Sequence, residues 1–111
     1  MVGVRVRVIR YVSPDPQPGL VECELIDANG RAWLFVEKAA VVSCESLGPK
    51  TQFPQEGVIA CEVIGQTLRT DGKKLVRIDT ELPFGVETVD GEHRFEIPEE
   101  SLVERTDPMG D

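Results

Sequence analysis

The sequence is poor in the residues that most often build catalytic or metal centres. Its 111 residues include three cysteines, one histidine and six aromatic residues. No Cys-x-x-Cys spacing occurs, which excludes the common zinc-ribbon and dithiol motifs. His93 is the one imidazole that any Ser/His/Asp or Cys/His arrangement would have to use, and neither arrangement is supported. No Gly-rich phosphate loop is present. We therefore expect a protein that is not an enzyme, with no catalytic residue, no cofactor and no metal.

Long apolar runs are also absent. A membrane helix needs roughly 18 to 20 consecutive apolar residues, and no segment approaches that length. The N-terminal stretch MVGVRVRVIRYV alternates valine with arginine, where a signal peptide would be continuously apolar. The sequence thus predicts a cytoplasmic protein that does not associate with membranes.

Helical periodicity is missing, and strand periodicity takes its place. No segment keeps a 3.6-residue apolar repeat, so we expect at most one or two short helical turns, one of them at residues 98–102. Apolar residues instead alternate with polar ones, and Asn29-Gly30, Asp71-Gly72 and Asp90-Gly91 supply tight-turn signals between them. This pattern predicts strands within residues 4–12, 20–38, 58–68, 73–82, 85–89 and 93–97, and a less certain one within 39–47.

The expected fold class is therefore all-β, as a small antiparallel barrel. Residues 85–104 predict the order strand, strand, helical turn, terminal strand, which favours an SH3-like barrel over an OB-like barrel or a sandwich. The length fits one domain at residues 1–105, with a frayed tail at 106–111.

Each of the three cysteines is followed by a glutamate, in the segments VECELI, SCES and IACEVI. Alternation places Cys23 on one strand face with apolar neighbours and Cys61 on another, between Ile59 and Val63. Free cysteine behaves as a small hydrophobe, so core filling is the favoured interpretation for both. A zinc site from the three cysteines and His93, or a reactive thiol, is the alternative. Cys44 lies in the least certain strand and is the first one to test for reactivity.

The negative charge of the chain is regional. Residues 79–111 carry eleven acidic residues against Arg94 and Arg105, a balance of −9, while residues 1–78 have a balance of +1. Such a surface repels nucleic acid and anionic lipid and suits a basic protein partner. We therefore predict a non-enzymatic protein-binding module. Its expected partner-binding residues are Glu87, Asp90, Glu92, Glu96, Glu99 and Glu100, with Phe53 as an apolar anchor.

Two features leave other functions open. Arg5, Arg7 and Arg10 form one basic cluster, in which Arg10 falls out of register unless a bulge intervenes; cross-strand pairing with the VECE or ACEV glutamates is favoured over nucleic-acid binding. The proline-stiffened segment 48–57 can either present Phe53 or fold it back as a lid. The alternative function is a small-ligand barrel with a pocket under that segment. Its expected lining residues are Trp33, Phe35 and Phe53.

Three stretches, PGLVECELIDANGRAWLFVEK, FPQEGVIACEV and VRIDTELPFGVET, resemble a group of short bacterial proteins of unassigned function. The resemblance covers most of residues 18–97. It implies a bacterial, intracellular, stand-alone domain and brings no catalytic residues. Small acidic bacterial proteins sometimes serve as antidotes to toxins, so an immunity-type role is an expectation by analogy. The sequence does not indicate an oligomeric state.

Overall fold

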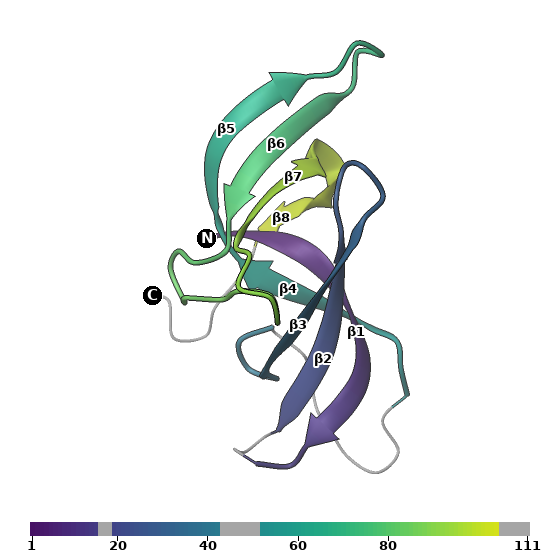
Figure 1. Cartoon of the computed structure of the whole chain (residues 1–111), viewed down its shortest axis with the longest axis vertical. Coiled ribbons are helices and arrows are strands. Elements are labelled where there is room, and N and C mark those ends of the chain that lie inside the picture. Colours follow the sequence, from purple (N-terminus) through teal and green to yellow (C-terminus); the bar gives the residue numbers. More distant parts are fainter. Residues whose placement is uncertain (16–18, 43–51, 105–111) are drawn as a thin grey trace.

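The structure, a computed structural model, describes residues 1–15, 19–42 and 52–104. It confirms the all-β prediction. The strands form two antiparallel sheets, one in the order β3-β2-β1-β4 with β8 also paired to β1, and one in the order β5-β6-β7. Figure 1 shows the β5–β6 hairpin extending away from the larger sheet, at the top of the view. The strand bounds are β1 Val2–Ser13, β2 Leu20–Ile26, β3 Ala32–Lys38, β4 Gln55–Ala60, β5 Glu62–Leu68, β6 Lys74–Asp79, β7 Arg94–Pro98 and β8 Leu102–Glu104.

Strand β1 is the centre of the larger sheet because it pairs with three other strands. Along one side it pairs with β4, from Gly3 opposite Ala60 onward. Along its other side it pairs first with β8, through Val4 opposite Leu102, and farther on with β2, from Arg7 opposite Glu24. The strands β2 and β8 thus pair with different parts of the same side of β1, and a gap between them lies at Arg5.

The core is formed by the residues that point inward as buried and exposed positions alternate along the strands. Val4, Val6 and Val8 are buried while Arg5 and Arg7 are exposed, as the period of two predicts. Buried side chains of both sheets join one apolar cluster, which includes Val21, Cys23, Leu25, Phe35, Val42, Ile59, Val76, Ile78, Val86, Phe95 and Ile97. One core therefore lies between the sheets.

The predicted bulge and turns are present. The register of β1 against β2 shifts between Val8 and Arg10, which brings Arg10 opposite Glu22. Gly30, Gly72 and Gly91 adopt positive φ angles in their turns. The predicted helical turn is a 3-10 turn, η1, at Glu99–Ser101, and it leads directly into β8 as expected.

Two strand predictions are wrong. The predicted strand 58–68 is two strands, because the chain leaves the larger sheet at Cys61 and enters the smaller one as β5. Residues 85–89 form no strand, since the Val89 amide bonds to the Leu34 carbonyl at 3.0 Å and no ladder with β7 develops. Residues 39–42 are turns, and the rest of the predicted 39–47 strand lies outside the described residues.

Barrel closure is the third difference. Within the described ranges, neither sheet closes on itself. Single backbone hydrogen bonds cross between the two sheets instead: the Ala28 amide donates to the Glu96 carbonyl at 2.8 Å. The continuous passages β4-Cys61-β5 and β7-η1-β8 hold the sheets together (Figure 1).

Candidate functional site

The acidic residues predicted to bind a partner begin on the segment between β6 and β7. We call residues 85–92 the acidic loop. Its conformation is fixed by two buried threonines. The Thr80 hydroxyl donates to the Val86 carbonyl at 2.8 Å, and the Thr88 hydroxyl accepts from the amides of Asp90 and Glu92 at 3.2 and 3.0 Å. The loop is therefore held by its own hydrogen bonds, although it is not a strand.

The base of this loop is anchored by a buried carboxylate. Asp79, at the end of β6, accepts from His93 Nδ1 at 2.8 Å, from Arg94 Nε at 3.3 Å and from the Glu81 amide at 2.9 Å. Burial raises the pKa of Asp79, but these three donors outweigh it and the net pKa lies below the ordinary 3.8. His93 joins the two ends of the segment that carries the acidic loop.

His93 is a partly buried histidine that is hydrogen-bonded to Asp79. Its side chain is 28% exposed, and the hydrogen bond to Asp79 raises its pKa above 6.5 while burial opposes that rise. Its Nε2 lies 3.7 Å from a carboxylate oxygen of Glu81. Sequence reasoning missed Asp79, because simple alternation after Ile78 places an aspartate toward solvent.

The structure places five of the six predicted acidic residues in two groups. Glu87, Asp90 and Glu92 are exposed on the acidic loop, whereas Glu99 and Glu100 are exposed on η1. The two groups lie at opposite ends of β7, whose five residues span about 17 Å. The sixth, Glu96, lies on β7 itself, half-buried and opposite Arg77 of β6.

None of these six carboxylates forms an ion pair with another described residue. The acidic loop also faces a further acid, Glu37 of β3. Burial raises the pKa of Glu37, the amide and the charge of Lys38 oppose this rise, and the nearby charge of Glu87 adds a smaller one. The charge of the loop is thus left available to a partner, and the neighbouring Glu37 increases it.

Apolar side chains are exposed next to the acidic loop. Val89, within the loop, is 61% exposed, and its amide is bonded to the backbone of Leu34. Leu34 and Val36 are themselves exposed on the outer face of β3. Exposed apolar residues rimmed by charge are typical of protein-binding surfaces. Sequence reasoning did not find these residues, because a wrongly predicted strand at 85–89 gave Val89 an ordinary place in a sheet.

The cysteines that the structure describes are core residues. Cys23 lies fully buried between Val21 and Leu25, as alternation predicted. Cys61 is buried as well, but Val63, expected on the same buried face, is exposed because the chain bends at Cys61 into β5. Burial raises the pKa of the Cys61 thiol to about 12. Cys44 lies outside the described residues, and no group of three potential metal ligands occurs within the described ranges.

The aromatic residues of the predicted ligand pocket pack with the core. Phe35 is fully buried, and Trp33 and Phe53 pack against the core cluster. The Trp33 ring lies edge-on to Phe95 with centroids 5.3 Å apart, and its Nε1 donates to Asp27 at 2.9 Å. Of the two alternatives for Phe53, the folded-back position is the one observed. Residues 48–51, the first part of the predicted pocket cover, lie outside the described residues.

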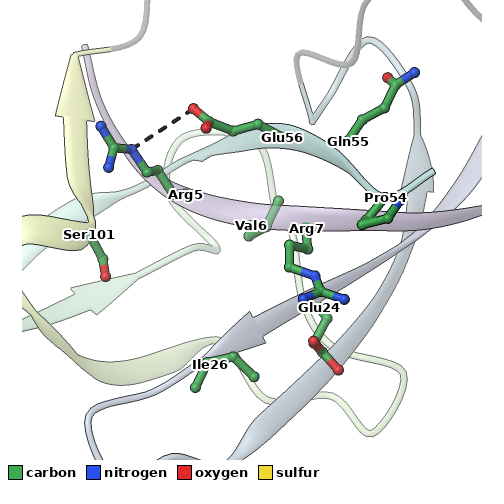
Figure 2. A pocket seen from close by; sticks show the side chains of 9 residues that line it. All are labelled: Arg5, Val6, Arg7, Glu24, Ile26, Pro54, Gln55, Glu56 and Ser101. Atoms are coloured by element: carbon green, nitrogen blue, oxygen red, sulfur yellow. Dashed lines mark ion pairs between the residues drawn. The ribbon is translucent and has the colours of Figure 1, made fainter. Parts of the chain in front are cut away.

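An open pocket of about 350 Å³ lies on the outer face of the larger sheet. Figure 2 shows its lining side chains, which come from β1, β2, η1, the start of β4 and Pro54 just before it. Arg5 Nε lies 3.9 Å from Glu56 Oε1, the one ion pair drawn there. The lining residues are Arg5, Val6, Arg7, Glu24, Ile26, Pro54, Gln55, Glu56 and Ser101.

One of the three arginines of the basic cluster pairs with a VECE glutamate, as predicted, whereas Arg5 pairs with Glu56. Arg10 Nε lies 3.0 Å from Glu22 Oε1, in the VECE segment. Arg7 lies opposite Glu24 of the same segment, but it forms no ion pair with a described residue. The ACEV glutamate, Glu62, is on β5 and pairs in register with Asp79 of β6.

Comparisons with family models, with curated proteins and with solved structures gave no match for this chain. Among the described residues, no helix has the length and apolarity needed to cross a membrane.

Proposed function

We propose that the chain is a non-enzymatic protein-binding module, and that the acidic loop with the apolar residues beside it binds a basic protein partner. The observation that carries the proposal is the combination at one place of exposed apolar side chains, Leu34, Val36 and Val89, with carboxylates that form no ion pair to a described residue. Apolar contacts provide binding energy, and complementary charge speeds association and selects the partner.

The fixed conformation of the acidic loop supports this role. A loop that is already held by Thr80, Thr88 and the Asp79–His93 hydrogen bond loses little conformational entropy on binding. Exposed carboxylates on such a loop present charge in one fixed arrangement. We place Glu87, Asp90 and Glu92 at the interface and Glu99, Glu100 and Phe53 outside it, which narrows the set predicted from sequence.

Two further observations favour binding over catalysis. A thiol with a pKa near 12, such as that of Cys61, is protonated at neutral pH and is a poor nucleophile. The His93 ring contacts two carboxylates, Asp79 at Nδ1 and Glu81 at 3.7 Å from Nε2, and no hydroxyl or thiol of a described residue is hydrogen-bonded to it, so it activates no nucleophile there.

A matched pair of charge reversals tests the location. E87K/D90K changes the acidic loop and E99K/E100K changes η1, with the same change in net charge. The immobilised protein is used to isolate partners from the source cells at low salt, partners are identified by mass spectrometry, and one purified basic partner is then titrated. We expect E87K/D90K to raise the Kd for this partner at least about tenfold. E99K/E100K should change the Kd far less.

Val89→Ser is the test of the apolar part. This substitution leaves the net charge unchanged and should also raise the Kd for the same partner. If both charge reversals weaken binding equally, the long-range field of the acidic region is responsible and the loop is not the interface. If the η1 variant alone loses binding, the site lies at Glu99 and Glu100.

We propose an immunity-type role in the bacterial cytoplasm, away from nucleic acid and membranes, which is supported by the sequence resemblance and the acidic region. A toxin gene adjacent to the gene for this chain would be the expected genetic setting. An SH3-like order is supported by η1 leading into a terminal strand that pairs with β1.

A further inference from the structure

The pocket on the outer face of the larger sheet is separate from the acidic loop. It opens where β2 leaves β1 after the Arg7–Glu24 pair and β8 joins β1 at Val4 (Figure 2). Side chains of two other elements, Glu56 of β4 and Ser101 of η1, complete its wall. At about 350 Å³ it is within the usual size range of small-ligand pockets.

The charges in the pocket are balanced, with two arginines and two glutamates. Arg5 and Glu56 satisfy each other loosely at 3.9 Å. Arg7 and Glu24 lie opposite each other on adjacent strands, yet neither forms an ion pair with any described residue. A guanidinium and a carboxylate are therefore both available, close together, on rigid strands.

The pocket also has an apolar part. Ile26, at the end of β2, is exposed there, and Val6 and Pro54 contribute to the same lining. In Figure 2 the Ile26 side chain stands apart from the Arg5–Glu56 pair, across the opening. A ligand that fits needs one apolar group besides its charges.

We propose that this pocket binds a free α-amino acid with an apolar side chain. The ligand carboxylate pairs with the Arg7 guanidinium, the ligand ammonium pairs with Glu24, and the side chain packs against Ile26. Balanced charge is the reason for a zwitterion: a simple anion would be repelled by Glu24 and Glu56, and a simple cation by the two arginines. An α-amino acid carries both charges on one carbon, which matches neighbouring positions on adjacent strands.

Three related compounds test the two ionic contacts separately. L-leucine carries both charges, leucinamide lacks the carboxylate, and N-acetyl-leucine lacks the ammonium. Each is titrated into the ¹⁵N-labelled protein. We expect saturable shifts of the amides of Arg5, Arg7, Ile26 and Ser101 with leucine, and binding at least roughly tenfold weaker for each of the other two compounds.

Two variants assign the contacts, and a third is the matched control. Arg7→Gln should remove the preference for leucine over leucinamide, and Glu24→Gln should remove the preference over N-acetyl-leucine. Arg77→Gln replaces an exposed arginine of β6 outside the pocket and should leave both preferences intact. An amide spectrum without ligand checks that each variant is folded.

Several results would overturn the proposal. They are the absence of saturable shifts at the pocket amides, equal affinity for the three compounds, and discrimination that persists in both Arg7→Gln and Glu24→Gln. Loss of partner binding in the acidic-loop variants has no bearing on these results, because the two sites share no residue.

Discussion

At the scale of single residues, the Asp79–His93 pair is the feature with the clearest chemical consequence. The pKa of His93 is raised by its hydrogen bond to Asp79, so charged His93 stabilises the fold below about pH 6.5 and this contribution is lost as pH rises through the raised value. The pKa of Asp79 is lowered by its donors despite burial, so its contribution is present above about pH 3.8 and is lost as pH falls through the lowered value.

The pair therefore predicts greatest stabilisation between roughly pH 4 and 6.5. The free energy of unfolding, from urea denaturation at pH 5 to 9, should fall for the natural protein as pH rises through the pKa of His93. His93→Gln should lack that fall. Because His93 is the only histidine, its single imidazole Hε1 signal reports the pKa directly, and Asp79→Asn should lower it.

The prediction would be contradicted if the free energy of unfolding changed with pH in the same way for the natural protein and for His93→Gln. The charged groups that surround the imidazole are Asp79, Glu81 and Arg94, and the arginine opposes the rise in pKa. Asp90→Asn is the matched control for Asp79→Asn, since Asp90 is an exposed acid of the acidic loop whose carboxylate contacts no described charge.

Residue-level prediction from sequence succeeded where burial follows alternation and failed where it follows tertiary contact. Cys23 is buried because its neighbours Val21 and Leu25 set the face of a regular strand. The buried state of Asp79 depends instead on two donors farther along the chain, His93 just before β7 and Arg94 at its first position. Nothing in the local pattern around Asp79 specifies those donors.

At the scale of elements, β4 shows how backbone packing limits a sequence. A Cβ added at Gly57 would lie 2.9 Å from the Val42 carbonyl oxygen and 2.9 Å from Val8 Cγ2. Backbone cannot move away as a flexible side chain can. Gly65 of β5 offers the contrast, because a Cβ there would make ordinary contacts of 3.6 Å or more with Arg77.

Gly57→Ala should therefore lower the free energy of unfolding by about 1 to 3 kcal/mol. Gly65→Ala is the matched control, and it should change stability by no more than about 0.5 kcal/mol, since both changes give a strand the same methyl group. Urea denaturation at a single pH measures both. Equal effects would mean that the close approach of the Val42 carbonyl to β4 does not exist in solution.

Element boundaries were predictable to the extent that turn residues mark them. Gly30 and Gly72 stand in the expected turns with positive φ angles. The break at Cys61 carries no glycine or proline, so a continuous strand pattern runs through a change of sheet. At residues 85–89 the amides of Val86 and Val89 bond to the carbonyls of Thr80 and Leu34, so tertiary contacts take the donors that a ladder with β7 would have used.

At the scale of the whole molecule, the two sheets differ in how well they are supported. The larger sheet has β1 paired on both sides, whereas β5 is an edge strand paired to β6 alone within the described residues. Nearly all of β5 is exposed, and the hairpin it forms extends from the body of the molecule (Figure 1). The sequence pattern predicted this hairpin, but the separation into two unclosed sheets depends on the bend at Cys61.

We expect the β5–β6 hairpin to open locally more readily than the larger sheet, because it is less well supported. The hairpin tip is closed by the hydrogen bond from the Arg69 amide to the Lys73 carbonyl at 2.9 Å, while its base joins β1 through the bond from the Cys61 amide to the Val2 carbonyl at 3.1 Å. The two bonds differ in burial, because Cys61 is a buried core residue whereas Arg69 and Lys73 are both exposed. In native-state hydrogen exchange, protection should rise from Arg69 toward Cys61, with the amides of β1 exchanging near the global unfolding limit. Uniform protection along the hairpin would show instead that the smaller sheet opens only when the whole core does, and that the two sheets form a single cooperative unit despite their unequal support.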